Sequence, residues 1–374
     1  MPAADFVVVG AGIAGASLAY HLSRRATVIL LERESRPGYH TTGRSAAFYV
    51  PSYGDPGVRP LTLASRAFFQ APPAGFADTP LLRHRPALYI ARADQEESLT
   101  AFYNELTGHA PNAALLDAQE TLRRAPRLRP DYVQRAVLEP DCYDIDVAAL
   151  HQGYLRGFKQ RSGTLANNAE VTALSRKNGQ WRIMAGSTQY EAPVIVNAAG
   201  AWGDQLAEMA GAAPTGLTPM RRTVITFPAP EEAGVADWPL TFDIGHSFYF
   251  KPESGRILAS PADETPTPPS DVQPEDLDVA QLVERLETAT TLSIPRIENR
   301  WAGLRTFAPD RRPVIGYDDS VSGFFWLAGQ GGFGIQTAPA AAQLAESLAM
   351  GEDAPAALRD QGITAESYGP ARLR

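Results

Sequence analysis

The stretch DFVVVGAGIAG, residues 5–15, determines how the rest of this chain is organised. Its run of apolar residues predicts a short buried strand, and the amphipathic run at 14–23 predicts a helix. A second apolar run at 27–31 predicts another strand, which ends on Glu32. Strand, glycine-rich turn, helix, second strand and terminal acid follow the order of a dinucleotide-binding βαβ unit.

Each glycine of the turn has a separate role in such a unit. Gly10 permits the tight turn, Gly12 lets the backbone approach a pyrophosphate, and Gly15 lets the helix pack closely on the strand. We expect the phosphates at the helix N-terminus and a ribose hydroxyl against Glu32. A glycine-rich turn in an ordinary α/β unit is the alternative, and the turn by itself would serve NAD as well as FAD.

The composition predicts a soluble globular protein, with 44% hydrophobic and 20% charged residues among 374. This length accommodates two domains, or one large domain with insertions. The formal net charge of −8 argues against a nucleic-acid partner, which would require a basic face. The single cysteine, Cys142, excludes an internal disulfide, and the spacing of the histidines suggests no metal site.

The N-terminus and the cysteine usage predict a cytoplasmic protein. The first strand begins within five residues of Met1, so a cleavable signal peptide would remove the fingerprint. No apolar run approaches the ~18–20 residues of a transmembrane helix. A single cysteine fits a reducing compartment. Peripheral contact with the inner face of a membrane stays open.

A second glycine cluster near the C-terminus decides between the two dinucleotides. A buried strand at 324–328 leads into GQGGFGIQT, residues 329–337, and then into an alanine-rich helix at 338–349. The N-terminus of this helix would stabilise the negative charge of a reduced flavin. A nicotinamide cofactor has no need of this additional contact, so the pattern favours FAD.

Between these glycine clusters the sequence predicts a separate sheet, because four short strand-like runs follow one another at 222–227, 241–243, 247–251 and 256–260. We therefore expect an α/β protein of the two-domain α+β type. A Rossmann-like FAD-binding domain would comprise residues 1–85, 141–220 and 301–374. A substrate domain with a mostly antiparallel β-sheet would comprise residues 86–140 and 221–300.

Six segments together resemble the D-amino-acid oxidase/glycine oxidase-like (DAO) family of FAD oxidoreductases. They are VGAGIAGAS (8–16), GYHTTGRSAA (38–47), 144–157, VNAAGAW (196–202), WAGLRTF (301–307) and GQGGFGIQT (329–337). The resemblance covers nearly the whole chain and is strongest to bacterial FAD-dependent D-arginine dehydrogenase. It implies oxidative deamination of D-amino acids: hydride passes from the substrate Cα to flavin N5, and the imino acid hydrolyses to a 2-oxo acid and ammonia.

The resemblance also implies FAD bound without a covalent link. Arg44 and Ser45, in a loop of small and hydroxylated residues, would donate to a phosphate or to a ring edge, and a plain solvent loop is the alternative. His40 and Gly43 share the spacing that some relatives use for covalent attachment. The expected cofactor-binding residues are Gly10, Gly12, Ile13, Ala14, Gly15, Glu32, Arg33, Thr42, Gly43, Arg44, Ser45, Ala46, Ala47, Val171, Ala198, Gly200, Trp202, Gly331, Gly332, Phe333, Gly334, Ile335, Gln336 and Thr337.

For the substrate, the resemblance implies a carboxylate clamp. Arg305 matches the family's carboxylate-binding arginine and Arg222 resembles its partner, and a planar guanidinium donates two parallel hydrogen bonds to a carboxylate. Tyr249 is similar to the tyrosine that bonds the same carboxylate, and Tyr53 to the loop tyrosine over the substrate. The alternatives are a surface cation beside Arg221 for Arg222 and a packed strand aromatic for Tyr249.

The remaining substrate residues predict specificity. Gly303, Gly332 and Gln336 would line the amine and flavin side of the pocket. Ala87 stands where D-arginine dehydrogenase has an acid that meets the substrate guanidinium, and Phe48 stands where it has a histidine. Because an unpaired buried cation is costly, we expect neutral or apolar D-amino acids to be preferred over D-arginine.

Other functions stay open at this stage. The same fold would serve an amine or N-methyl amino acid oxidase, or a 2-hydroxy-acid dehydrogenase. A FAD-binding scaffold or sensor without turnover belongs to another class, and the carboxylate clamp argues against it. The resemblance favours a dehydrogenase with an unknown electron acceptor, such as a quinone or a dye-like acceptor, over an oxidase.

Overall fold

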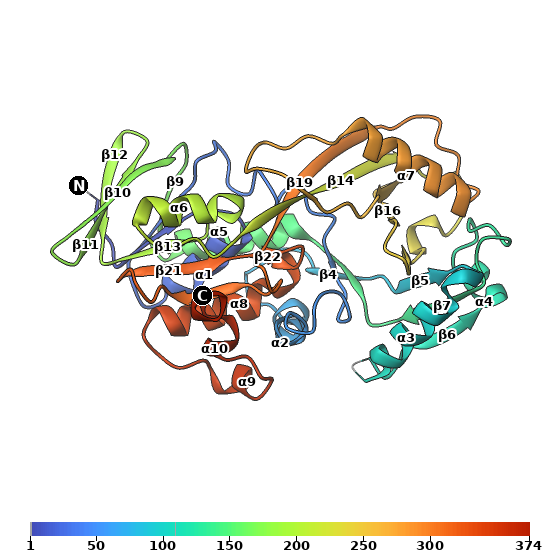
Figure 1. Cartoon of the computed structure of the whole chain (residues 1–374), viewed down its shortest axis with the longest axis horizontal. Coiled ribbons are helices and arrows are strands. Elements are labelled where there is room, and N and C mark those ends of the chain that lie inside the picture. Colours follow the sequence, from blue (N-terminus) through green and yellow to red (C-terminus); the bar gives the residue numbers. More distant parts are fainter. Residues whose placement is uncertain (1, 109) are drawn as a thin grey trace.

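A computed structural model describes residues 2–108 and 110–374 of the chain. Figure 1 shows two lobes, with both chain termini in the same one. The long strands β14 (Thr218–Pro228) and β19 (Asn299–Phe307) run from one lobe toward the other (Figure 1). Each lobe is therefore assembled from segments that lie far apart in the sequence.

The first lobe contains a six-stranded sheet in which only the edge pair β20–β21 is antiparallel. Strand β1 lies between β13 and β2, so its apolar run FVVV is buried on both faces. In spatial order the strands are β20 (Val314–Tyr317), β21 (Phe324–Ala328), β13 (Val194–Asn197), β1 (Phe6–Val9), β2 (Val28–Leu31) and β9 (Thr164–Ala166).

The two faces of this sheet bury alternate residues of β1. Val8 belongs to a core shared with helices, whereas Val7 and Val9 belong to a core shared with a small antiparallel sheet and helix α6. The helices of the first core are α1 (Ile13–Leu22), α2 (Arg59–Gln70), α5 (Val147–Gln160), α8 (Gly334–Ala349), α9 (Ala356–Arg359) and α10 (Ala365–Tyr368). The second core includes α6 (Gly203–Ala210) and the sheet of β10 (Val171–Lys177), β11 (Gln180–Ala185) and β12 (Thr188–Ala192).

Residues 164–177 form two strands of different sheets with a turn between them. The chain turns at Asn168, whose φ of +52° lies in the left-handed region that asparagine tolerates. Ala169 then donates its N–H to the carbonyl of Glu32. The segment is therefore divided into β9, which extends the parallel sheet, and β10, which begins the small antiparallel sheet.

The second lobe contains a sheet of ten strands that is antiparallel except where β5 pairs with β15. Its spatial order is β22 (Gln330–Gly331), β19, β14, β17 (Arg256–Ser260), β16 (Tyr249–Glu253), β15 (Leu240–Asp243), β5 (Ala87–Ala91), β7 (Arg135–Glu139) and β6 (Ala114–Asp117), with β18 (Thr265–Pro266) on β14. Apolar residues of α7 (Asp276–Ala289) pack on one face, and those of α3 (Glu96–Thr107) pack on the other, while α4 (Ala118–Arg124) follows β6.

A third small sheet of β3 (Phe48–Tyr49), β8 (Tyr143–Ile145) and β4 (Leu82–His84) lies where the chain passes between the lobes. These findings confirm the predicted fold class. The predicted division into domains stays a prediction, and its boundary at residue 300 falls inside β19, which belongs to the large sheet.

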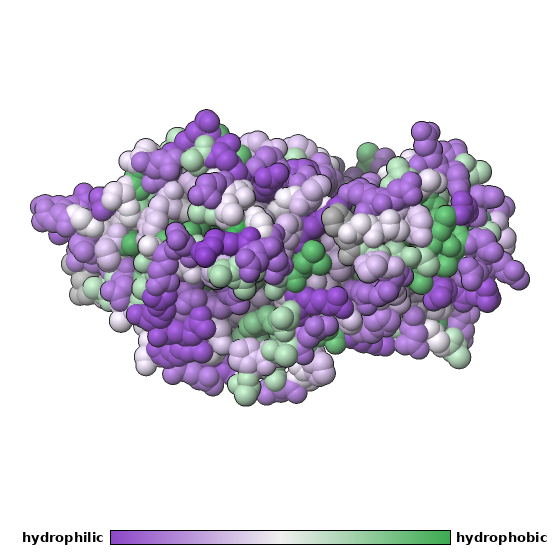
Figure 2. Space-filling model, turned by 90° about the horizontal axis from the view of Figure 1, so that it is seen from below, coloured by the Kyte–Doolittle hydropathy of each residue, from purple (hydrophilic) through white to green (hydrophobic). Residues whose placement is uncertain are grey.

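The face of the molecule in Figure 2 is mainly hydrophilic, with separate smaller apolar patches. Among the described residues, the exposed large hydrophobic side chains are Tyr39, Leu63, Met209 and Leu277. Within that part of the chain, no helix combines the length and the apolar character that crossing a membrane would require. Two of the four exposed side chains, Tyr39 and Met209, lie at the cavity described next.

Candidate active site

One elongated cavity of about 360 Å³ extends along both lobes. Its lining begins at the βα turn after β1 and continues along the loop at 38–48. It ends at β14, β16 and β19 of the large sheet and at the start of α8. Ligand sites at the carboxyl ends of parallel strands are typical of doubly wound sheets.

The first end of the cavity fits a dinucleotide. Gly10 has a φ of +101°, and a Cβ at this position would overlap the carbonyl of Ala198. Gly12 is the N-cap of α1 and provides no side-chain cap, which leaves the helix terminus free for an anion. A Cβ at Gly15 would overlap the carbonyl of Gly10 and would lie 3.2 Å from the side chain of Val8 on β1, so glycine lets the helix pack closely on the strand, as the sequence predicted.

Glu32 lines the cavity at the end of β2 and is 7% exposed. Its two carboxylate oxygens accept hydrogen bonds from the backbone N–H groups of Ala11 at 2.9 Å and Glu34 at 3.0 Å. The carboxylate therefore helps to hold the glycine turn in place at the cavity. A ribose contact at Glu32 stays a prediction.

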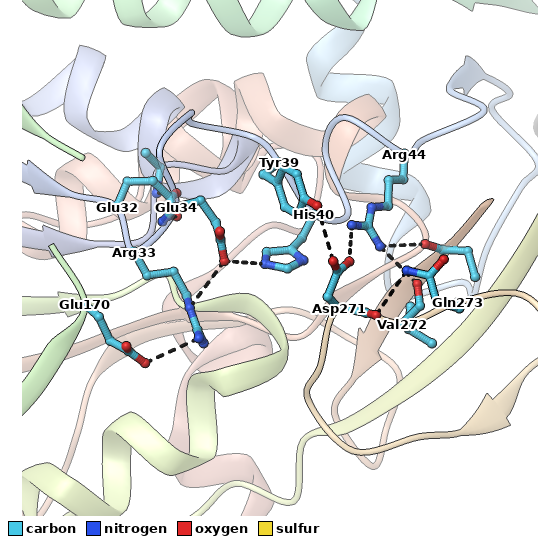
Figure 3. A network of polar contacts seen from close by, with 12 residues as sticks. Glu32, Arg33, Glu34, Tyr39, His40, Arg44, Glu170, Asp271, Val272 and Gln273 are labelled. Atoms are coloured by element: carbon cyan, nitrogen blue, oxygen red, sulfur yellow. Dashed lines mark hydrogen bonds and ion pairs between the residues drawn. The ribbon is translucent and has the colours of Figure 1, made fainter. Parts of the chain in front are cut away.

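Beyond Glu32, charged and aromatic side chains form the wall of this end (Figure 3). The guanidinium of Arg33 pairs with Glu34 at 3.4 Å and with Glu170 at 3.3 Å, and it lies 4.8 Å from the ring centroid of Trp202. The Nε2 atom of His40 lies 3.0 Å from the same Glu34 carboxylate. Planar groups of this kind form a surface suited to an adenine ring.

Arg44 makes contacts that the sequence did not predict. Its guanidinium donates to the backbone carbonyls of Val272 at 3.1 Å and Ala302 at 3.0 Å and pairs with Asp271, as Figure 3 shows in part. Asp271 also accepts a hydrogen bond from Tyr39 at 3.2 Å. Arg44 lines the cavity, yet these donors connect the 38–48 loop to the segment before α7.

The substrate end of the cavity contains both predicted arginines. Arg222 on β14 pairs directly with Gly303 on β19. Arg305 follows Gly303 by two residues, and side chains two residues apart on a strand point to the same face, so both arginines project from the same face of the sheet. Arg305 Nη2 donates to the Tyr53 hydroxyl at 2.7 Å. Tyr249 projects from β16 into the same cavity.

Electrostatics couple Tyr53 to the arginine pair. Burial by itself raises the pKa of Tyr53, but the charges of Arg305 and Arg222 outweigh it and lower the pKa below its ordinary value. Burial lowers the pKa of Arg305, although Tyr53 partly opposes this change. Burial also acts to lower the pKa of Arg222, but Tyr53 and Tyr249 lead the interactions that raise it overall. Both guanidinium groups stay charged near neutral pH, as binding of a carboxylate requires.

Aromatic rings close this end of the cavity. The ring of Phe48 meets those of Tyr53, Phe242 and Tyr249 edge to face, with centroids 5.4, 5.6 and 5.9 Å apart. Val224, which the sequence analysis missed, lines the same end. It lies two residues after Arg222 on β14, and the two-residue period of a strand would have indicated it.

Gln336 supports the loop that carries Tyr53. Its amide oxygen accepts from the N–H of Val50 at 3.1 Å, and its Nε2 donates to Thr62 Oγ1 at 3.0 Å and to the carbonyl of Tyr53 at 3.4 Å. The side chain is 2% exposed and lines the cavity. Its contacts show a positioning role for the loop, and its predicted contact with the amine or flavin stays a prediction.

Most of the predicted residues line the cavity, and the structure places five elsewhere. Gly43 packs against the carbonyl of Gly38, and the Thr337 hydroxyl donates to the Phe333 carbonyl inside α8. Ala87 is fully buried within β5, where the adjacent strands and an apolar cluster surround it. The five predicted residues outside the cavity lining are Gly15, Gly43, Ala87, Phe333 and Thr337.

The fold and the site together define a two-lobed α/β dinucleotide-binding protein with a buried arginine pair. A family model described as "DAO: FAD dependent oxidoreductase" matches residues 5–348. The chain belongs to this family of FAD-dependent oxidoreductases, and FAD is its cofactor.

Comparisons with individual proteins agree with this assignment. The chain is 26% identical to mitochondrial dimethylglycine dehydrogenase of Rattus norvegicus over 367 residues, which cover 89% of this chain and 41% of that protein. It therefore spans less than half the length of this relative. Glycine oxidase of Geobacillus kaustophilus aligns with a TM-score of 0.81 at 21% identity, over 94% of this chain and 96% of that one. L-proline dehydrogenase of P. horikoshii aligns with a TM-score of 0.83 at 20% identity, over 100% and 98%.

Proposed function

We propose that this protein oxidises the amine of a small amino carboxylate, with neutral or apolar D-amino acids as substrates. The observation that supports the proposal is the pair of Arg222 and Arg305, two buried guanidinium groups that face one cavity beside the hydroxyls of Tyr53 and Tyr249. Such a pair suits a carboxylate because both cations are already desolvated and oriented.

The residues of the cavity would have different roles in the reaction. FAD, when bound, supplies the acceptor for the hydride that leaves the substrate Cα. The arginine pair would bind the carboxylate, Tyr53 and Tyr249 would add hydrogen bonds, and the aromatic wall would exclude water. Hydrolysis of the imino acid then gives a 2-oxo acid and ammonia.

The wall of the pocket supports a neutral substrate side chain. Phe48, Val224 and Tyr249 line this end, and the buried cluster behind them includes Ala87. A guanidinium or ammonium in this wall would meet aromatic and aliphatic groups without a carboxylate partner. We infer that the chain resembles D-arginine dehydrogenase in architecture but prefers other substrates.

Anaerobic flavin reduction tests the proposal. We expect D-Leu, D-Met and D-Phe to bleach the flavin absorbance faster than D-Arg at equal concentration. Arg305→Ala should lower the apparent second-order rate by about 100-fold or more, because it removes a charge-assisted bidentate contact. Faster reduction by D-Arg, or no reduction by any amino acid, would contradict the proposal.

A second candidate is oxidation of a secondary or N-methylated amino acid. The name of the dimethylglycine dehydrogenase relative supports it, since that substrate joins a carboxylate to a methylated amine. Sarcosine and dimethylglycine belong in the same anaerobic panel as the D-amino acids, with a 2-hydroxy acid for the remaining alternative. The class that reduces the flavin fastest identifies the substrate.

We further propose that FAD is held without a covalent bond and that reduced protein passes its electrons to an acceptor other than oxygen. The ring of His40 contacts Glu34 and Trp202, at the end of the cavity that suits the adenine ring and not the flavin. FAD released into the supernatant by acid precipitation would support the first point. Slow stopped-flow reoxidation in air, with fast reoxidation by a quinone, would support the second.

A further inference from the structure

Glu264 bridges the two arginines of the proposed carboxylate clamp. It follows β17 and directly precedes β18. Its Oε1 lies 3.2 Å from Arg222 Nη2 and 3.4 Å from Arg305 Nη1. One protein carboxylate therefore pairs with both cations that would bind the substrate carboxylate.

This carboxylate approaches the arginines from outside the cavity. Arg222 and Arg305 both line the cavity, whereas Glu264 is absent from its lining among the described residues. The carboxylate of its neighbour Asp263 accepts from the N–H and hydroxyl of Thr223 at 2.7 and 3.0 Å, and the backbone carbonyl of Asp263 accepts from Arg222 Nε at 2.7 Å. Glu264 thus leaves the substrate position free and acts as a counter-ion behind the clamp.

Arg311 holds Glu264 in this position. Its Nη2 lies 3.0 and 2.9 Å from the two oxygens of Glu264, and its guanidinium lies 3.9 Å from the ring centroid of Phe307. Arg311 has a φ of +60°, a left-handed conformation that is unfavourable for arginine. A strained backbone at this residue is consistent with a function for the ion pair.

The charges determine how many carboxylates the clamp accommodates. The side chains of Arg222 and Arg305 are 11% and 10% exposed and that of Glu264 is 32% exposed, whereas the Arg311 side chain is 41% exposed and is the one most screened by solvent. With Glu264 in place, the two arginines of the clamp retain at most one net positive charge, because the Asp263 carboxylate also acts on Arg222. A single substrate carboxylate balances that charge. A second carboxylate would bring a negative charge into the site without a cation to balance it.

We propose that Glu264 is a positioning residue that restricts the site to monocarboxylic amines and disfavours dicarboxylic ones. The proposal rests on the proposed function, since it assumes that the arginine pair binds the substrate carboxylate. It refines that function by giving the charge class of the substrate. Acidic D-amino acids and other dicarboxylates are disfavoured by the same carboxylate that orients the clamp.

Binding of two unreactive, nearly isosteric ligands tests this inference without turnover. Succinate has two carboxylates, and succinamate has one carboxylate and one amide. Their dissociation constants for the FAD-loaded protein are measured from the change in flavin absorbance. We expect wild type to favour succinamate and E264Q to shift the affinity ratio toward succinate by about tenfold, because a negative charge that pairs with both arginines of the clamp is removed.

Matched variants separate this charge effect from damage to the fold. E264D retains the charge and should keep the wild-type ratio, while E264A should shift it in the same direction as E264Q. E287Q removes one charge at an exposed position of α7 and should leave the ratio unchanged. A ratio unchanged in both E264Q and E264A, or shifted equally in E264D, would overturn the inference.

A further variant distinguishes failure of this inference from failure of the proposed function. R305A should weaken both ligands, because it removes half of the clamp. If R305A leaves succinamate binding unchanged, the proposed carboxylate clamp is wrong, and the inference is wrong with it. If R305A abolishes binding but the Glu264 variants do not change selectivity, only the role of Glu264 is wrong.

Discussion

At the scale of single residues, Gly332 and Arg305 constrain one another. A Cβ at position 332 would overlap the guanidinium of Arg305, so the arginine reaches the cavity only because this position has no side chain. The three rings that surround the guanidinium, those of Tyr53, Phe307 and Phe333, have centroids 5.6–5.8 Å from it. Glycine at position 332 therefore leaves the space that the Arg305 guanidinium occupies in the substrate site.

Gly332→Ala should displace the guanidinium of Arg305 and weaken binding of a carboxylate ligand. Loss of a charge-assisted hydrogen bond costs about 1.5–3 kcal/mol, or roughly 10- to 100-fold in affinity. Titration of the flavin absorbance with succinamate measures the change. Gly108→Ala is the control, because this residue lies away from the cavity, has a φ of −69°, and its added methyl group would meet the carbonyl of Glu105 at 3.4 Å, an ordinary contact. Equal effects of the two substitutions would contradict this account.

At the scale of elements, the turn between β20 and β21 depends on one buried carboxylate. Asp318 accepts hydrogen bonds from Trp326 Nε1 at 3.0 Å, from the Ser320 N–H at 2.9 Å and from the Val321 N–H at 3.0 Å, and it pairs with Arg374. Burial acts to raise the pKa of Asp318, but the donors, led by Trp326 and Ser320, outweigh it and lower the pKa to about 2. The turn is thus stabilised by the ionised carboxylate.

The sign of the pH dependence follows from this lowered pKa. Asp318 binds its proton less readily in the folded chain than in the unfolded chain, so its stabilisation is complete above its ordinary pKa of 3.8 and is lost as the pH falls toward about 2. Asp318→Asn should lower the free energy of unfolding by about 2 kcal/mol at pH 7. The difference should shrink below pH ~4.

Denaturant unfolding of wild type and Asp318→Asn at several pH values measures this effect. Asp319→Asn is the control, because this neighbouring side chain is 54% exposed and lies 3.6 Å from the same Arg374. A stability difference that is independent of pH down to 3 would show that the effect does not come from ionisation of Asp318.

At the scale of the whole molecule, a buried ion cluster joins the small sheet between the lobes to the large sheet. Asp144 on β8 accepts from Arg85 Nε at 2.5 Å and from Lys251 Nζ at 2.7 Å, and Lys251 belongs to β16 of the large sheet. The side chains of Arg85 and Lys251 are each 3% exposed. Since Tyr249 lies on the same strand as Lys251, this cluster also helps to place the substrate end of the cavity.

Asp144→Asn should destabilise the whole protein by about 3 kcal/mol, because it leaves the buried Arg85 without its carboxylate and leaves Lys251 with Glu253 alone, at 2.7 Å. Thermal or denaturant unfolding measures the loss. Asp141→Asn is the matched control, since this nearby carboxylate is 39% exposed and its ion pair with Arg66 is 3.9 Å long. Equal stability of Asp144→Asn and wild type would show that the cluster does not stabilise the joint.

The sequence by itself determined the nucleotide end of the molecule. Residues 5–32 contain a strand, a turn, a helix and a second strand in immediate succession, so local patterns predict both the elements and their contact. The glycines of this unit are required by the backbone, and the structure agrees at Gly10 and Gly15. The family resemblance then indicated the arginines and tyrosines of the substrate end.

Only the tertiary structure decided how the substrate end is assembled. Arg222, Arg305 and Tyr53 meet because β14 and β19 pair in one register and a distant loop folds over them, which no local pattern encodes. Ala87, predicted for the pocket, lies inside a strand, and Arg44 contacts the segment before α7. Glu264 lies in the connection between β17 and β18, and its contact with three arginines depends on long-range packing alone.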